Sequence, residues 1–201
     1  MADWPGVHPQ VRALLQAAAA EPQDPAPPSL EAERAAYLDT TLRLGGAAEP
    51  VAAIDDVLVP QGDARLAAAL YAPLHAPGTT GLIVWLHGGG WYVGDIPTFD
   101  RVARALANAS GQKVLMLDYR LAPEHCFPAQ VHDADATLRW TRSDAGAQRL
   151  GIDAARVVIG GDSAGGQLAA VAARHARQRP ARAPDDAATA ASMRAAIALP
   201  V

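Results

Sequence analysis

A single serine among small residues is the first candidate for chemistry in this sequence. Ser163 lies in the stretch GGDSAGG, where Gly161, Ser163 and Gly165 fit the pattern G-x-S-x-G. In that pattern the serine occupies a sharp turn between a strand and a helix, and small neighbours let the hydroxyl project. The first amides of the helix then face any anion that forms there. We therefore predict that Ser163 is a nucleophile and that the backbone N–H of Ala164 is one oxyanion donor.

A second glycine-rich stretch, HGGGW, runs from His87 to Trp91 and directly follows an apolar segment. Its three successive glycines leave backbone amides uncovered, so that a substrate oxygen can approach them closely. A loop of this kind forms the other half of the oxyanion hole in lipases and esterases. The sequence predicts this role for Gly88, Gly89 and Gly90 and leaves open which two of them donate.

Four side chains beside these two motifs have candidate roles. His87 precedes the amides instead of facing the serine, which favours a structural hydrogen bond to the glycines over a role as base. Asp162 flanks the serine, and we expect a structural hydrogen bond from it too. Trp91 and Tyr92 could line an acyl or alcohol pocket, and ordinary packing is an equal alternative.

A serine nucleophile needs a histidine base and an acid that orients it. In a strand–turn–helix site the chain order is serine, then the acid, then histidine. His175 is the only histidine after Ser163, twelve residues later. At about 1.5 Å per residue it lies roughly 18 Å along the same helix, beyond hydrogen-bond reach. We expect the acid and base to be missing from this chain. His175 and the arginines around it are interpreted as a solvated helix end.

Alternating strands and helices must position these motifs. Two N-terminal helices are predicted over Val7–Ala20 and Leu30–Leu44. Strands are predicted over 53–60, 65–73, 81–90, 113–123, 155–161 and 193–201, and helices over 98–110, 128–145 and 163–179. Thr98 is a plausible cap for the first of these helices and Gly111 a plausible stop. Repeated strand–helix units indicate a mostly parallel sheet with helices on both faces.

The stretches HGGGW, DYRLAPEHCFPA and GDSAGG together resemble the hormone-sensitive-lipase-like group of α/β-hydrolases, the bacterial family IV esterases. The resemblance runs from about Ile54 to Val201. It implies an α/β-hydrolase fold and carboxylic ester hydrolysis without a metal or organic cofactor, with Ser163 as nucleophile and Ala164 and Gly88–Gly90 as oxyanion hole. It also implies a buried structural turn that contains Tyr119, Arg120, Pro123 and Glu124.

The same resemblance suggests how the chain is organised. Residues 1–50 would be a helical cap segment and residues 51–201 an incomplete core, together one structural domain that is truncated after the sixth strand. The final strand would leave a raw parallel edge with Ile197 and Leu199 uncovered, which predicts a tendency to form homo-oligomers.

Composition excludes several classes of protein. The chain has 201 residues, of which 50% are hydrophobic, and a formal net charge of −4. This acidic balance argues against a nucleic-acid partner, and no stretch is long and apolar enough to span a membrane. A lone Cys126 allows no internal disulfide, and the N-terminus does not resemble a signal peptide. We expect a cytoplasmic protein.

The leading hypothesis is a hydrolase of small, short-chain carboxylic esters. A ligand-binding protein without turnover is the alternative, because the plant gibberellin receptors resemble this family and have lost the catalytic histidine. A fragment without function of its own is the third. The natural ester and the preferred enantiomer cannot be read from the sequence.

Overall fold

The computed structural model of the chain describes residues 6–20, 27–76, 78–178 and 197–198. It divides into two compact units, Met1–Glu33 and Arg34–Val201. Helix α1 (Pro9–Ala20) lies in the first unit, and helix α2 (Leu30–Leu44) begins there and continues into the second. Both N-terminal helices predicted from the sequence are therefore confirmed. The division of the chain at residue 50 into cap and core stays a prediction.

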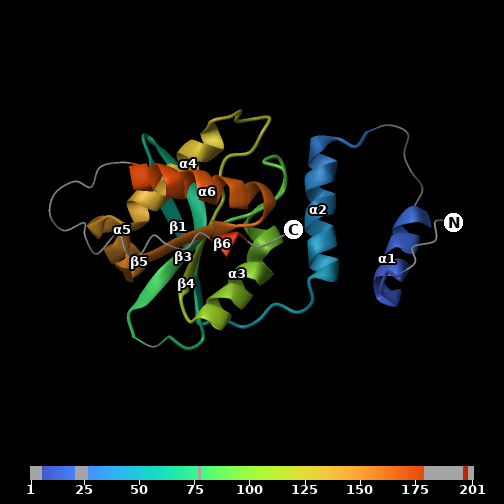
Figure 1. Cartoon of the computed structure of the whole chain (residues 1–201), viewed down its shortest axis with the longest axis horizontal. Coiled ribbons are helices and arrows are strands. Elements are labelled where there is room, and N and C mark those ends of the chain that lie inside the picture. The colour runs from blue at the N-terminus through green and yellow to red at the C-terminus, as the bar shows by residue number, and fades with distance from the viewer. Residues whose placement is uncertain (1–5, 21–26, 77, 179–196, 199–201) are drawn as a thin grey trace. The chain divides into compact units, whose positions relative to one another are not determined.

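The second unit is built on one sheet, which Figure 1 shows at the centre of that unit. Its strands follow the order β1-β2-β4-β3-β5-β6. Their bounds are β1 Ala53–Gln61, β2 Ala64–Ala72, β3 Thr80–Leu86, β4 Lys113–Leu117, β5 Ile152–Gly161 and β6 Ile197–Ala198. Strand β2 pairs antiparallel with β1 and with β4. Strand β3 pairs parallel with β4 and with β5, and β5 pairs parallel with β6. The predicted mostly parallel sheet is confirmed.

Helices cover both faces of the sheet, as predicted. Helices α4 (Ala129–Thr141), α5 (Asp144–Leu150) and α6 (Ser163–Gln178) pack on one face, and α3 (Ile96–Ser110) packs on the other (Figure 1). Successive strand residues point to opposite faces, so Val84 belongs to the first core and Trp85 to the second. Burial on both faces explains why β3 and β4 are continuous apolar runs.

The strand register brings the future site to one edge of the sheet. Leu86, at the end of β3, is level with Leu117 of β4 and with Gly161 of β5. The residues that follow these three strands therefore emerge side by side at their carboxyl ends. This edge is where parallel α/β sheets bind ligands.

Two details of the helices differ from the sequence predictions. The N-cap of α3 is Asp95, whose carboxylate accepts a hydrogen bond from the Thr98 amide at 2.8 Å, so Thr98 is not the cap. Gly111 does end this helix in the left-handed conformation. The helix predicted over 128–145 is interrupted, because the Ser143 side chain accepts a hydrogen bond from Gly146 N–H and starts α5 as a separate helix.

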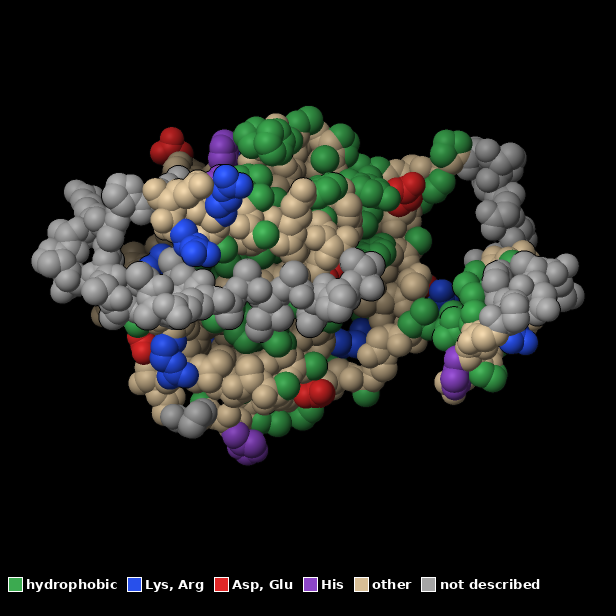
Figure 2. Space-filling view, in the orientation of Figure 1, with side chains coloured by type: hydrophobic (Ala, Val, Ile, Leu, Met, Phe, Trp, Pro, Cys, Tyr) green, Lys and Arg blue, Asp and Glu red, His purple; other side chains and the backbone are tan. Residues whose placement is uncertain are grey.

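No helix in the described ranges is long and apolar enough to cross a membrane. Figure 2 shows Lys and Arg side chains interspersed with Asp and Glu side chains over the face that it presents. The predicted uncovered side chains of Ile197 and Leu199 lie outside the described residues, so the tendency to form homo-oligomers stays a prediction.

Candidate active site

The turn that carries Ser163 joins β5 to α6 without a loop. Only Asp162 separates Gly161, the last residue of the strand, from Ser163, the first of the helix. Ser163 has a φ of +46°, a left-handed conformation that costs a residue with a side chain about 1–2 kcal/mol. The side chain is exposed. We call residues 161–163 the serine turn; its backbone has the strained form that the G-x-S-x-G pattern predicts.

The helix that begins at Ser163 approaches the end of β3 very closely. A Cβ atom at Gly161 or Gly165 would collide with the carbonyl oxygen of Leu86, and at Gly165 it would also meet the carbonyl of His87. Helix α6 can therefore start at the end of the strand only because position 165 has no side chain. This contact explains in physical terms why small residues surround the serine.

Asp162 connects the serine turn to the glycine loop, by which we mean residues 88–93. Its Oδ1 accepts a hydrogen bond from Gly88 N–H at 2.9 Å. A Cβ atom on Gly88 would overlap this carboxylate. The Gly88 amide is thus engaged by Asp162, which leaves Gly89 and Gly90 as the loop glycines whose amides are open to a substrate oxygen.

Several backbone amides near the serine turn have no acceptor within the part of the chain that the structure describes. The amides of Gly89, Gly90 and Ala164, which the sequence predicts as candidate oxyanion donors, are among them. The Ala164 amide is free because it lies in the first turn of α6. Gly89 adopts a φ of +116°, which a residue with a side chain would rarely adopt, and its carbonyl accepts from the amides of Tyr92 and Val93. Such free donors are what an oxyanion hole requires.

His87 is fully buried, and no hydrogen bond joins it to Ser163. Its Nδ1 lies 2.7 Å from the Gly88 carbonyl oxygen. Since a carbonyl only accepts, Nδ1 carries the proton. The ring stacks on Tyr119 at 4.4 Å and on Phe99 at 5.3 Å between ring centroids. Burial lowers the pKa of His87 below its ordinary value, so the imidazole is neutral. The geometry suits a structural role, which stays a prediction.

The segment after β4 supports the loop from its other side. The Tyr119 hydroxyl donates to the carbonyl oxygen of His87 at 2.7 Å, and burial raises the pKa of this phenol. Arg120 binds the fully buried carboxylate of Asp133 through its backbone amide, Nε and Nη2. The predicted buried turn is wrong in part, because Pro123 and Glu124 are exposed. Glu124 instead forms an ion pair with Arg34 on α2.

All six histidines lie among the described residues, and none forms a hydrogen bond with Ser163. His175 lies in the last turn of α6 with its side chain 40% exposed, beside the exposed Arg174 and Arg177, which agrees with a solvated helix end. The sequence analysis did not anticipate its contact with α4, where its Nδ1 lies 3.0 Å from Oδ2 of Asp135. The sequence analysis missed this pair because α4 and α6 are brought together only by packing on the same face of the sheet.

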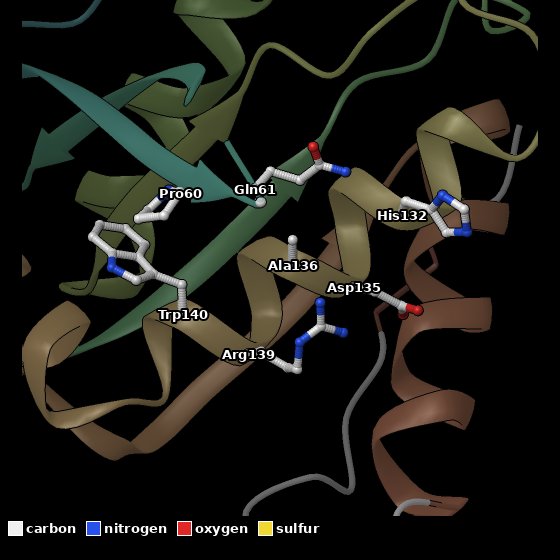
Figure 3. Close-up of a pocket in the computed structure, with 8 residues that line it drawn as sticks. Pro60, Gln61, His132, Asp135, Ala136, Arg139 and Trp140 are labelled. Atoms are coloured by element: carbon white, nitrogen blue, oxygen red, sulfur yellow. The ribbon is translucent and has the colours of Figure 1, made fainter. Parts of the chain in front are cut away.

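Two cavities in the described part of the chain are not lined by residues of the serine turn. One, of about 460 Å³, lies between α4 and the turn after β1, as Figure 3 shows. A second, of about 450 Å³, lies beside His175. Neither is lined by Ser163, Trp91 or Tyr92. Both aromatic side chains are exposed on the glycine loop, and their role in a substrate pocket stays a prediction. No group of three or more metal-binding side chains gathers in the described ranges.

Several known proteins with similar sequences are named as esterases or ester hydrolases. A family model described as "alpha/beta hydrolase fold" matches residues 83–196, more than half of the chain. The chain is 41% identical over 126 residues to the carboxylic ester hydrolase LipN of Mycobacterium tuberculosis. It is 38% identical over 129 residues to an arylesterase of Saccharolobus solfataricus. These matches cover 63% and 64% of this chain but 33% and 41% of the two relatives.

Solved structures show the same pattern. The hyperthermophilic esterase from the archaeon Pyrobaculum calidifontis superposes with a TM-score of 0.78 at 38% sequence identity. The match covers 86% of this chain and 55% of that one. This chain therefore spans between a third and just over half of the length of these proteins.

Proposed function

Since this chain belongs to the alpha/beta hydrolase fold family, we propose that it carries the nucleophile and the oxyanion hole of a carboxylic ester hydrolase. The observation that supports this proposal most is the serine turn. It combines an exposed serine at a φ of +46° with the free backbone amides of Gly89, Gly90 and Ala164, which come from two separate segments. A turn that only connected a strand to a helix would require neither the left-handed conformation of Ser163 nor the free amides of Gly89 and Gly90 in the glycine loop.

The reaction would proceed through an acyl-enzyme. The Ser163 Oγ attacks the ester carbonyl carbon while a base accepts the hydroxyl proton, and the carbonyl oxygen becomes an oxyanion. The amides of Gly89, Gly90 and Ala164 donate to this oxygen, and the positive end of α6 adds to its stabilisation. Collapse of the intermediate releases the alcohol with a proton and leaves the acyl group on Ser163. Water then releases the acid and restores the hydroxyl.

The acid and base of the triad are not supplied by the described residues at the serine turn. His87 forms no hydrogen bond with Ser163, and its Nε2 is buried without a partner among the described residues; His175 pairs with Asp135 near the far end of α6. We therefore propose that this 201-residue chain by itself turns over esters far more slowly than a complete triad. Amides that stabilise an oxyanion can still provide about 10³-fold acceleration over water in a well-formed site.

The substrate class follows from the names of the relatives. One is named a carboxylic ester hydrolase and the other an arylesterase. We propose small, short-chain esters as substrates, with Trp91 and Tyr92 beside the acyl or alcohol group. We further propose that residues 1–50 form a cap segment and residues 51–201 the core, that no cofactor is needed, and that the protein is cytoplasmic.

A second candidate function is ligand binding without turnover. The observation that favours it is that Ser163 has no base among the described residues, although the amides around it could still bind a carboxylate or ester oxygen. An intact serine in this turn favours the hydrolase, because the G-x-S-x-G turn is the form that presents a serine hydroxyl as a nucleophile.

Hydrolysis of p-nitrophenyl acetate and p-nitrophenyl butyrate separates the two functions. We expect slow, saturable hydrolysis by the purified chain, and loss of that hydrolysis in Ser163→Ala. Equal rates for the chain and for Ser163→Ala would contradict the hydrolase. Saturable binding of butyrate by both proteins would then favour the ligand-binding alternative.

A further inference from the structure

Arg34 joins α2 to two loops at the candidate active site through four hydrogen bonds. It belongs to the second compact unit, as do both loops. Its Nε donates to the carbonyl of Tyr92 at 2.8 Å, and its Nη2 donates to the carbonyl of Ala122 at 3.1 Å. The two Nη atoms also bind the two carboxylate oxygens of Glu124 at 2.7 and 2.9 Å. One planar guanidinium thus holds both segments.

Both carbonyls that Arg34 binds belong to residues whose amides are bonded to the glycine loop. Tyr92 N–H donates to the carbonyl of Gly89 at 3.1 Å, and Ala122 N–H donates to the carbonyl of Trp91 at 2.8 Å. Arg34 is therefore connected to Gly89 through Tyr92 and to Trp91 through Ala122. Through these bonds it contacts the glycine loop, which carries the free amides of Gly89 and Gly90.

The glycine loop needs such support because its backbone is strained. Trp91 has a φ of +65°, which a bulky side chain adopts only when surrounding contacts impose it. Its side chain is 38% exposed and cannot impose that conformation by burial alone. The hydrogen bond from Ala122 and the adjoining bonds from Arg34 join this part of the loop to other segments, in addition to the bonds from Tyr92 and Val93 N–H to Gly89 within the loop.

The ion pair persists at neutral pH although it is partly exposed. The side chains of Arg34 and Glu124 are 31% and 51% exposed, and an isolated pair of that kind contributes little to stability. The Arg34 hydrogen bond lowers the pKa of Glu124 to about 2, so the carboxylate stays charged wherever the protein is folded near neutrality. Arg34 acts through the paired hydrogen bonds of its guanidinium to the Glu124 carboxylate and through its hydrogen bonds to the carbonyls of Tyr92 and Ala122.

We propose that Arg34 is a positioning residue for the oxyanion hole: through Tyr92, Ala122 and Glu124 it holds the glycine loop so that Gly89 and Gly90 present their amides to the substrate oxygen. This inference rests on the proposed function of the loop. It assigns a role in catalysis to a residue of α2 that itself touches neither substrate nor Ser163.

The test compares Arg34→Met with Arg101→Met in the full 201-residue chain. Arg101 is a matched control, because its guanidinium also bonds backbone carbonyls, those of Leu42 and Gly46, but makes no contact with the glycine loop. Hydrogen exchange of the amides of Tyr92, Val93 and Ala122 measures the order of the loop. The rate at which a fluorophosphonate modifies Ser163, with turnover number and KM for p-nitrophenyl acetate, measures the oxyanion hole.

We expect Arg34→Met to speed exchange of these amides about tenfold and to slow modification of Ser163 by a similar factor, with KM little changed. Arg101→Met should change neither. Arg34→Lys keeps the positive charge but cannot form the paired hydrogen bonds of a guanidinium, so it should also speed amide exchange and slow Ser163 modification. It replaces Arg34→Met in the test if that variant does not fold. Unchanged exchange would overturn the proposal. Faster exchange with an unchanged rate at Ser163 would show a merely structural contact and would overturn it too.

The proposed function can fail separately from this inference. A wild-type chain that is never modified at Ser163 contradicts the nucleophile and the role of the loop in catalysis. The exchange comparison does not depend on that reaction and still decides whether Arg34 orders the glycine loop.

Discussion

His87 and His175 lie in opposite situations relative to the serine turn. His87 lies next to the loop that faces Ser163, but it is buried, neutral and bonded to Gly88. His175 is paired with Asp135 as a catalytic histidine is paired with its acid, but it lies near the other end of α6. One region therefore has an exposed serine and free backbone amides without a histidine bonded to the serine, and the other has a paired histidine and carboxylate far from that serine.

The difference between these regions shows that geometry decides chemistry here more than residue type does. Ser163 and the glycine loop follow adjacent strands, so the sheet register places them together at one edge. His175 is separated from Ser163 by most of a rigid helix, and no movement of a side chain can cover roughly 18 Å. A histidine–aspartate pair has catalytic meaning only beside the group that it activates.

The largest expected effect separates the serine region from the histidine–aspartate region. Ser163→Ala should abolish the hydrolysis of p-nitrophenyl acetate that the chain catalyses, because the acylated atom is removed. His175→Ala should leave the rate unchanged, because His175 cannot reach Ser163. Steady-state kinetics on both variants checks this. A His175→Ala variant that folds but loses the Ser163-dependent rate would show that the two regions cooperate.

Within the serine region, Gly89→Ala should lower the turnover number about a hundredfold or more, because one oxyanion donor is displaced. A Cβ atom at Gly89 would collide with the backbone carbonyl of Val93. Gly62→Ala is the matched control, since Gly62 also has a positive φ, +57°, but open space around it. If the two variants reduce turnover equally, the glycine loop is not the oxyanion hole.

The same two regions can be compared in folding stability, because each is bonded to a carboxylate on α4. Asp133 is fully buried and binds Arg120 of the segment after β4, whereas the buried Asp135 binds His175, whose side chain is 40% exposed. Asp133→Ala should lower the free energy of unfolding by about 3 kcal/mol, because it leaves Arg120 unpaired against a buried site. Asp135→Ala should lower it by about 1 kcal/mol. Urea denaturation of both variants measures the difference, and the reverse order would contradict this account of the site's support.

The smallest expected effect concerns pH. Burial places the pKa of folded His87 below the 6.5 of an ordinary histidine, so the unfolded chain binds more protons than the folded one below pH 6.5. Folding stability should fall as pH drops through that range, by at most about 1.4 kcal/mol per pH unit from this residue. His87→Phe keeps the stacking surface and removes the titration. Denaturant unfolding at pH 7, 6 and 5 should show a shallower loss for this variant; an equal loss would contradict the buried neutral imidazole.

The sheet, its flanking helices and the turn at Ser163 could be predicted because local signals specify them. Apolar runs mark β3 and β4, and small residues at 161 and 165 are required by the close contact between α6 and β3. The separate helix α5 was missed because its start depends on the cap at Ser143, inside a pattern that continues as helical.

The supporting contacts of the site could not be predicted, since they join residues distant in the sequence. Arg34 reaches Tyr92 and Glu124, and Asp135 reaches His175, only after the sheet has brought their elements together. A structural hydrogen bond of Asp162 was expected from the sequence, but its partner Gly88 was not; this bond leaves Gly89 and Gly90 as the candidate donors among the three loop glycines.

Phosphonate labelling tests the central claim most directly. The 201-residue chain is exposed to a p-nitrophenyl phosphonate, digested, and mapped by mass spectrometry, with Ser163→Ala treated in parallel. We predict that the phosphonyl group is found on Ser163, because the free amides of Gly89, Gly90 and Ala164 stabilise the developing oxyanion there, and that Ser163→Ala is not labelled. A tag on another residue, with Ser163 unmodified in the wild-type chain, would contradict the assignment of Ser163 as nucleophile.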